Sequence, residues 1–105
     1  MENVRKLAEL RAKIDVVDEQ LLALLNTRAQ LALKVRIAKG SDTAYRPERE
    51  AEVLRQITDK NSGPLSNEAI RTMFTSIIYV CRAIQDIEIK ESDLSLLDGE
   101  TTSAS

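Results

Sequence analysis

The sequence predicts an all-α fold with three helices per chain, one of them a very long N-terminal helix. Only three Gly, two Pro and three aromatic residues occur among 105 residues, so the usual signals of strands and hairpins are nearly absent. Apolar residues make up 43% of the chain, which is enough for one modest core without disulfides or metal ions. The third observation is a long N-terminal stretch without Gly or Pro.

Bulk charge and residue usage exclude several classes of protein. The net charge is −2 with both signs interspersed, which disfavours a nucleic-acid interface or a basic membrane-binding face. Cys81 is the single cysteine and there is no His, so an internal disulfide is excluded and the commonest metal ligand is missing. No signal-peptide pattern or run of ~20 apolar residues occurs. We expect a cytoplasmic protein without metal, nucleic-acid or membrane partners.

The first helix is expected from Val4 to about Lys39. Its apolar residues recur at alternating spacings of three and four, which is a heptad seam. The seam comprises Leu7, Leu10, Ile14, Val17, Leu21, Leu24, Leu31, Val35 and Ala38. At ~1.5 Å per residue the helix is roughly 54 Å long, whereas a compact monomer of this size is only about 33 Å across. One chain cannot cover it, which predicts an intertwined homodimer.

The second helix is expected from about Pro47 to Asp59. Residues 40–43, which include a Gly, end the first helix, and Pro47 suits a first helical position. Acidic residues in the following turn favour the helix dipole. The cluster Asn61-Ser62-Gly63-Pro64 ends this helix.

The third helix is expected to start after an N-cap at Ser66 and to continue to about Lys90. It carries a broad apolar face, which should pack against the long helix. From residue 92 onward the chain is rich in Ser, Thr, Asp and Glu, and we expect a flexible tail. The predicted organisation is a helical domain over residues 1–91 and a tail over residues 92–105.

One charged residue interrupts the apolar seam. With Leu7 at heptad position a, Arg28 falls at another a position and is the only charge on the seam. Burying an unpaired guanidinium costs several kcal/mol, so an anion must meet it or the helices must part there. Val35 and Lys39 continue the same face, and Lys39 lies roughly 16 Å further along. Two cations beside an apolar floor suit a ligand with two carboxylates.

Simpler explanations of the two cations stay open. Arg28 is also explained as a register-setting residue paired with a Glu. Lys39 is also explained as a cation that favours the C-terminal end of the helix dipole.

Arg11 comes within reach of this face only through a second copy. It lies about 25 Å of helix rise before Arg28, too far to share a small ligand within one chain. If two long helices run antiparallel across a dimer axis, Arg11 of one copy approaches Arg28 and Lys39 of the other. The alternative is an ordinary salt bridge to a nearby acid.

Four side chains on the later helices are further candidates. Arg49 and Glu50 lie in the first turn of the second helix, where backbone N–H groups are free; alternatively they belong to an exposed helix start. Gln85 is a neutral amide on an apolar face and must find partners, either a ligand or core groups. Cys81, one turn earlier, is also explained as a small core residue.

Three stretches of the chain resemble the all-helical chorismate mutases. They read LRAKIDVVDEQLLALLNTRAQLALKVRIAK, YRPEREAEVL and MFTSIIYVCRAIQ, and the likeness runs from about Leu7 to Ile87. The first block, LR-x2-ID-x2-D-x2-LL-x2-L-x2-R, is long and specific. The RE pair and the Gln follow at the spacings that the family uses.

The resemblance implies a function and a set of roles. It implies an intertwined dimer that converts chorismate to prephenate in phenylalanine and tyrosine biosynthesis, without cofactor or metal. Arg11, donated across the interface, and Arg28 would hold the two carboxylates of the substrate. Lys39 and Gln85 would donate to the ether oxygen, and Glu50 would accept from the ring hydroxyl. Arg49 would complete the pocket.

This chemistry suits a chain without His. The reaction is a unimolecular Claisen rearrangement that needs no nucleophile, proton transfer or metal. The protein has to hold the reactive conformer and stabilise negative charge on the ether oxygen. An amide at position 85 donates at any ordinary pH, so we expect activity through neutral and mildly alkaline pH.

Two residues depart from the pattern of some relatives. Arg46 stands where some carry an acid, and Cys81 where some carry a hydroxyl; we expect both at the edge of the binding site. Whether the chain stands alone or is part of a larger enzyme is left open. The nearest alternative is an isochorismate-pyruvate lyase of the same fold, which Glu50 disfavours. An alternative from another class is a non-catalytic helical dimerisation or regulatory module.

Overall fold

The structure, a computed structural model, describes residues 2–40 and 46–88 and places most of them in three helices. These are α1 (Glu2–Lys39), α2 (Pro47–Lys60) and α3 (Asn67–Glu88). The described residues form no strand, which confirms the all-α prediction. Each helix boundary that the structure describes lies within about two residues of the predicted one. The predicted continuation of the third helix to Lys90 and the predicted tail lie outside the described residues.

α1 ends at the glycine that the sequence marks. Gly40 has a φ of +63°, a left-handed conformation that glycine adopts without the steric cost of a Cβ. Its N–H donates to the carbonyl of Ile37 at 3.0 Å, and Arg36 Nη1 donates to the Gly40 carbonyl at 3.0 Å. The first bond satisfies one of the last carbonyls of the helix, which have no i+4 partner, and the second holds the turn that follows.

α2 and α3 form a helical hairpin with well-defined ends. Pro47 occupies the start of α2, after Arg46 in an extended conformation. In the connection, Asn61 Nδ2 donates to the Leu65 carbonyl and to Asn67 Oδ1, both at 2.8 Å. Ser66 Oγ accepts from the N–H of Ala69 at 3.0 Å, which confirms the predicted N-cap.

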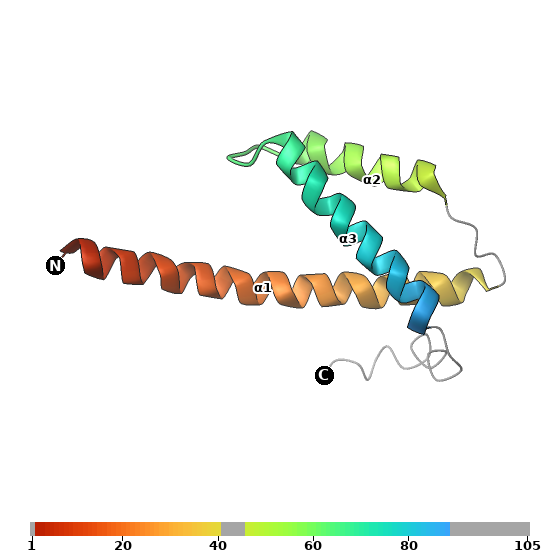
Figure 1. The fold of residues 1–105 in the computed structure, drawn as a ribbon, viewed down its shortest axis with the longest axis horizontal. Coiled ribbons are helices and arrows are strands. Elements are labelled where there is room, and N and C mark those ends of the chain that lie inside the picture. Colours follow the sequence, from red (N-terminus) through yellow and green to blue (C-terminus); the bar gives the residue numbers. More distant parts are fainter. Residues whose placement is uncertain (1, 41–45, 89–105) are drawn as a thin grey trace.

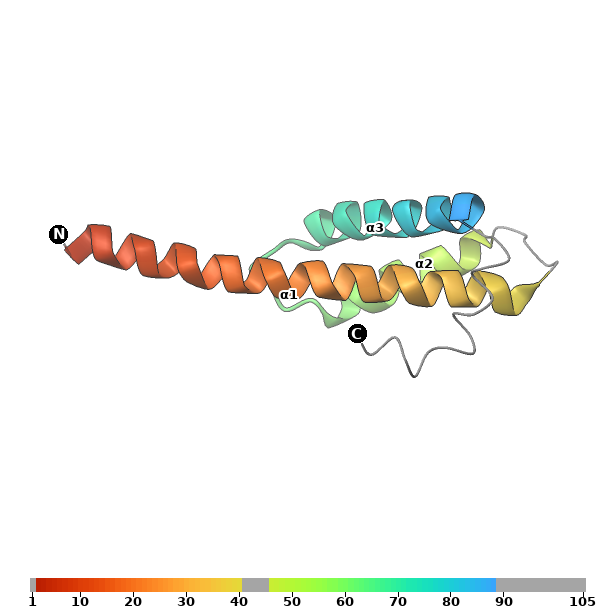
Figure 2. The ribbon, with the colours of Figure 1, turned by 90° about the horizontal axis from the view of Figure 1, so that it is seen from below.

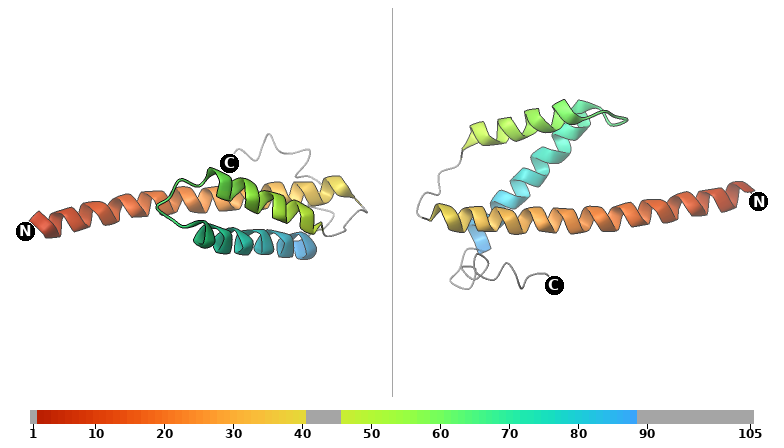
Figure 3. Two further views of the ribbon diagram at one scale, coloured as in Figure 1. Left: turned by 90° about the horizontal axis from the view of Figure 1, so that it is seen from above. Right: turned by 180° about the vertical axis from the view of Figure 1, so that it is seen from behind.

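The hairpin lies beside the C-terminal half of α1 only. α3 packs against both α1 and α2, as predicted for α1, and crosses α1 near its C-terminal end (Figure 1). The N-terminal half of α1 extends beyond the hairpin in every view (Figures 2 and 3). The radius of gyration is 17.8 Å, whereas a compact chain of this length has one near 13 Å.

The apolar seam of α1 is left largely exposed by the other residues that the structure describes. The residues classed as buried are Ile78, Cys81 and Thr58, all on the hairpin, and α1 contributes none among those described. Ile14 is 57% exposed and Leu24 68% exposed. A continuous apolar surface of this kind marks an interaction site. No helix in the described part of the chain has the length and apolar character to span a membrane.

Candidate functional site

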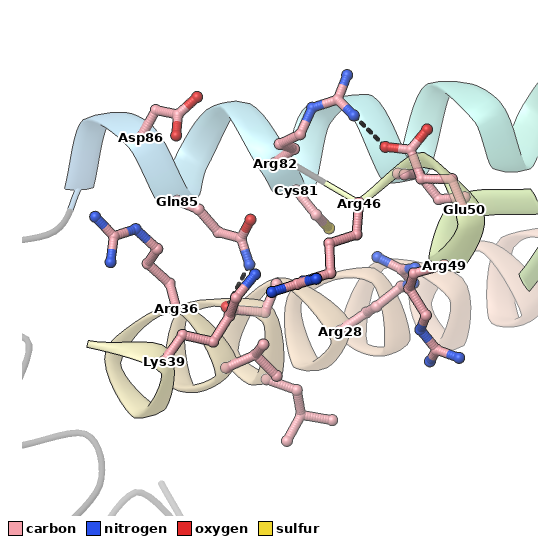
Figure 4. Close-up of a pocket in the computed structure, with 14 residues that line it drawn as sticks. Arg28, Arg36, Lys39, Arg46, Arg49, Glu50, Cys81, Arg82, Gln85 and Asp86 are labelled. Atoms are coloured by element: carbon pink, nitrogen blue, oxygen red, sulfur yellow. Dashed lines mark hydrogen bonds and ion pairs between the residues drawn. The ribbon is translucent and has the colours of Figure 1, made fainter. Parts of the chain in front are cut away.

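A pocket of about 680 Å³ lies where the C-terminal half of α1 meets α2 and α3 (Figure 4). Its lining includes eight of the nine predicted site residues. These are Arg28, Val35, Lys39, Arg46, Arg49, Glu50, Cys81 and Gln85. The three helices therefore bring together residues that are up to 57 positions apart in the sequence.

α1 supplies one wall of the pocket from a single helical face. Arg28 and Lys39 lie toward its two ends, and Ala32 and Val35 lie between them, as steps of three and four residues require. Both cations are only partly exposed. Val35 and the neighbouring Leu31 are 53% and 54% exposed, so the apolar part of this wall is incompletely covered by its own chain.

Gln85 connects α3 to α1. Its Nε2 donates to the backbone carbonyl of Ala32 at 2.7 Å, a bond that holds the side chain between α3 and α1 (Figure 4). An amide nitrogen carries two hydrogens, so Nε2 has a second one to donate to a ligand. Cys81 lies one turn earlier on α3 and is 6% exposed. It forms a small, buried part of the pocket wall that α3 supplies.

Glu50 is held from α3 by a residue that the sequence analysis missed. Arg82 Nη1 and Glu50 Oε2 form an ion pair between α3 and α2, drawn as a dashed line in Figure 4. Arg82 lies three positions before Gln85 on a mostly apolar helix. A charge at that place is the signal that could have identified it, because a buried helix face rarely carries an unpaired guanidinium.

Arg49 lines the pocket but bonds to its own helix. Its Nη1 contacts Glu52 Oε1 at 2.9 Å, and the two side chains are 67% and 44% exposed. This is an ordinary surface pair at spacing i, i+3. The expected contact between Arg49 and a ligand stays a prediction.

The pocket is strongly cationic although the whole chain has a net charge of −2. It gathers six cationic side chains against two acidic ones, an excess of four positive charges. Three of the charged lining residues were not predicted from the sequence, namely Arg36, Arg82 and Asp86. The cationic residues are Arg28, Arg36, Lys39, Arg46, Arg49 and Arg82. Such a pocket suits a small dianion, and Lys39 and Gln85 add donors for an oxygen that gains charge.

Arg11 and a metal site are not part of this pocket. Arg11 is exposed on the N-terminal half of α1 and, about 25 Å of helix rise from Arg28, cannot reach the pocket of its own chain. Within residues 2–40 and 46–88, no cluster of three or more His, Cys, Asp or Glu side chains could hold a metal ion.

A sequence profile of chorismate mutase type II matches residues 10–86. The chain belongs to this family. The matched segment contains all nine predicted site residues, from Arg11 to Gln85. The resemblance to the chorismate mutases that the sequence motifs indicated is therefore confirmed.

Curated relatives of the family are similar over most of this chain. A bifunctional chorismate mutase/prephenate dehydratase of Neisseria gonorrhoeae is 44% identical over 75 residues, which are 71% of this chain and 21% of the relative. The corresponding protein of Pseudomonas aeruginosa is 42% identical over 87 residues, 76% of this chain and 24% of the relative. The chain thus spans about a fifth to a quarter of the length of these relatives.

Two solved structures from the family share the fold over nearly their whole length. A chorismate mutase from Thermus thermophilus has a TM-score of 0.76 at 28% identity and matches 81% of this chain and 99% of its own. A chorismate mutase from Helicobacter pylori in complex with prephenate has a TM-score of 0.75 at 33% identity, with 81% and 94% covered. The helical architecture is therefore that of the family.

Proposed function

We propose that this chain catalyses the rearrangement of chorismate to prephenate, as a step of aromatic amino-acid biosynthesis. The observation that carries the proposal is the convergence of Arg28, Lys39, Glu50 and Gln85 on one cationic pocket. Membership of the chorismate mutase family supports it. The relative from Helicobacter pylori was solved with prephenate, which supports the same class of ligand here.

The reaction divides into two tasks that these residues suit. A flexible dianion must first be held in the compact conformer in which its reacting carbons are close, which lowers the entropic part of the barrier. As the C–O bond then breaks, negative charge grows on the ether oxygen, and donors aimed at that oxygen stabilise the transition state more than the substrate. Neither task requires a group that exchanges a proton.

In this proposal each residue has one role. Arg28 binds a carboxylate, because a guanidinium presents paired donors that match carboxylate geometry. Lys39 and Gln85 donate to the ether oxygen. Gln85 is already oriented by the Ala32 carbonyl, so little reorganisation is needed when charge develops. Glu50 accepts from the ring hydroxyl.

The active unit in this proposal is a homodimer, in which Arg11 completes the pocket of the other copy. The seam of α1 is exposed, as are Leu31 and Val35 at the pocket wall. Burying these apolar side chains against a second copy would be favourable. An antiparallel pair of long helices supplies cover to both copies at once. In this proposal the active site is formed by two copies of the chain, binds chorismate and needs no cofactor.

The heptad pattern is compatible with the register that this dimer needs. In an antiparallel pair, residues at position a pack in layers with residues at position d of the other helix. Placing Ile14 against the partner's Leu24 also places Val17 against the partner's Leu21. The same register brings Leu10 opposite the partner's Arg28, so the adjacent Arg11 lies beside the partner's pocket.

Mixing two inactive variants tests whether Arg11 acts across the interface. Arg11→Ala and Lys39→Ala are each expected to lose at least about 10² in kcat/KM as homodimers. After the two chains are refolded together, half of the dimers are mixed, and each mixed dimer has one intact site. The mixture should recover about a quarter of wild-type activity. An Arg11 that acts within its own chain would give no recovery.

The proposed reaction itself is tested by incubating the purified protein with chorismate and following the loss of its diene absorbance. Turnover to prephenate is expected. The same assay with isochorismate separates the mutase from a pyruvate lyase, for which isochorismate would be the consumed substrate. Turnover of neither compound would contradict the proposal and favour a helical dimerisation module.

The pH profile should depend on the amide at position 85. Wild-type activity is expected to stay nearly constant through neutral and mildly alkaline pH, because an amide does not titrate there. Gln85→Glu should be active only in acid, since a carboxyl with an ordinary pKa near 4.3 loses its donor proton as the pH rises. The measurement is kcat/KM against pH for both proteins. A wild-type rate that collapses above about pH 6, with the protein still folded, would contradict the assigned role.

A further inference from the structure

An ion pair between Arg82 of α3 and Glu50 of α2 holds an acidic side chain of the pocket. The two residues are 32 positions apart in sequence, and their side chains are 35% and 26% exposed. An ion pair that is mostly shielded from water is less screened than a surface pair. Both side chains line the pocket, so the pair is part of the site wall rather than an outer brace.

Glu50 shares the pocket with several cationic side chains. Arg28 and Arg49 line the same cavity, and each would attract a mobile carboxylate. Arg49 is already bonded to Glu52, and Arg82 holds Glu50 toward α3 (Figure 4). Because Glu50 pairs with Arg82, the positive charge of Arg28 is not offset by Glu50 and can attract an anionic ligand.

The placement of Arg82 on α3 couples two polar groups of the site. Arg82 and Gln85 are separated by three positions, so they lie on neighbouring parts of one helix face. Gln85 bonds to the carbonyl of Ala32 on α1, and Arg82 bonds to Glu50 on α2. One helix therefore sets the position of a donor and of an acceptor at the same time.

We infer that Arg82 is a positioning residue for substrate recognition: it orients the Glu50 carboxylate toward the ring hydroxyl of the ligand and offsets its negative charge beside a dianion. This inference rests on the proposed chorismate mutase activity. It makes Arg82 a determinant of selectivity for a ligand with a hydroxyl at that ring position. Arg82 itself acts through Glu50 and makes no contact with the reacting atoms.

The expected kinetic signature is a change in KM. The ring hydroxyl is outside the bonds that form and break, so its hydrogen bond is equally strong in the bound substrate and in the transition state. Loss of such uniform binding raises KM and leaves kcat unchanged. Arg82→Gln should raise the KM for chorismate about tenfold, since a hydrogen bond to a charged group is weakened but not removed. Arg82→Lys, which keeps the charge, should stay within about threefold of wild type.

A double-mutant cycle tests whether Arg82 works through Glu50. In a Glu50→Gln background, Arg82→Gln should change KM by less than about twofold, because the group that it orients is gone. Arg71→Gln, an exposed arginine on the same helix outside the pocket, is the matched control and should behave as wild type. Thermal unfolding of every variant reports any general loss of structure.

The decisive probe is the chorismate analogue in which hydrogen replaces the ring hydroxyl. For this analogue the KM of Arg82→Gln should equal that of wild type, whereas a merely structural defect would raise KM for both compounds. Equal effects on the two compounds, fully additive effects with Glu50→Gln, or no effect on chorismate would each overturn the inference. A wild-type chain without chorismate turnover would overturn the proposed function, and the inference with it.

Discussion

Replacing Arg28 with Ala is expected to lower kcat/KM for chorismate by about 10²–10⁴ without weakening the dimer. Removing one partner from a buried ion pair costs about 3–5 kcal/mol, and here the partner is a carboxylate of the ligand. In the free protein, the same guanidinium occupies an a position of an otherwise apolar seam, where a charge is costly. Ala at this position should therefore leave folding intact or improve it.

Activity and stability of the Arg28 variant must be measured together. Steady-state kinetics give the loss in kcat/KM, while sedimentation and thermal unfolding give the oligomeric state and stability. Arg55→Ala, an exposed arginine of α2 outside the pocket, controls for the loss of one positive charge. If Arg28→Ala dissociated the dimer but the remaining dimers were fully active, Arg28 would be the register-setting residue that the sequence also allowed.

Features confined to one helix could be predicted from the sequence because helical periodicity alone determines them. Arg28, Val35 and Lys39 lie on one face of any straight helix that contains them, and the structure indeed places all three at the pocket. The helix ends at Gly40 and Ser66 also follow from local chemistry. The place of Gln85 in the same site could not be predicted from helical spacing. It was predicted from the resemblance to the family.

The contacts between helices could not be predicted in this way. The pairing of Glu50 with Arg82 depends on how α2 and α3 cross and on which of several nearby cations the carboxylate selects. No periodicity in the sequence contains that information. Arg49 is a different case, because Glu52 is three positions further along the same helix and such pairs are an ordinary expectation. The exposed helix start that the sequence allowed as the alternative for Arg49 agrees with this surface pair.

Ile14→Asp is expected to abolish both the folded dimer and all chorismate turnover. In the proposed register Ile14 packs against the partner's Leu24, so two-fold symmetry buries two new carboxylates per dimer. An unpaired buried charge costs several kcal/mol, and the lost apolar contact adds about 2–5 kcal/mol at each site. Two such sites together reach the total stability of a typical domain, about 5–15 kcal/mol.

The matched control is Ala12→Asp, which adds the same charge two positions away at heptad position f, on the outer face of α1. This variant should remain a dimer with wild-type kinetics, since an exposed carboxylate there displaces no apolar contact. Far-ultraviolet circular dichroism, sedimentation and the chorismate assay distinguish the two variants. A folded, active Ile14→Asp monomer would mean that one chain completes its own site. The 57% exposure of Ile14 in the isolated chain argues against that outcome, because such a monomer would leave the apolar seam in water and Arg11 too far from the pocket.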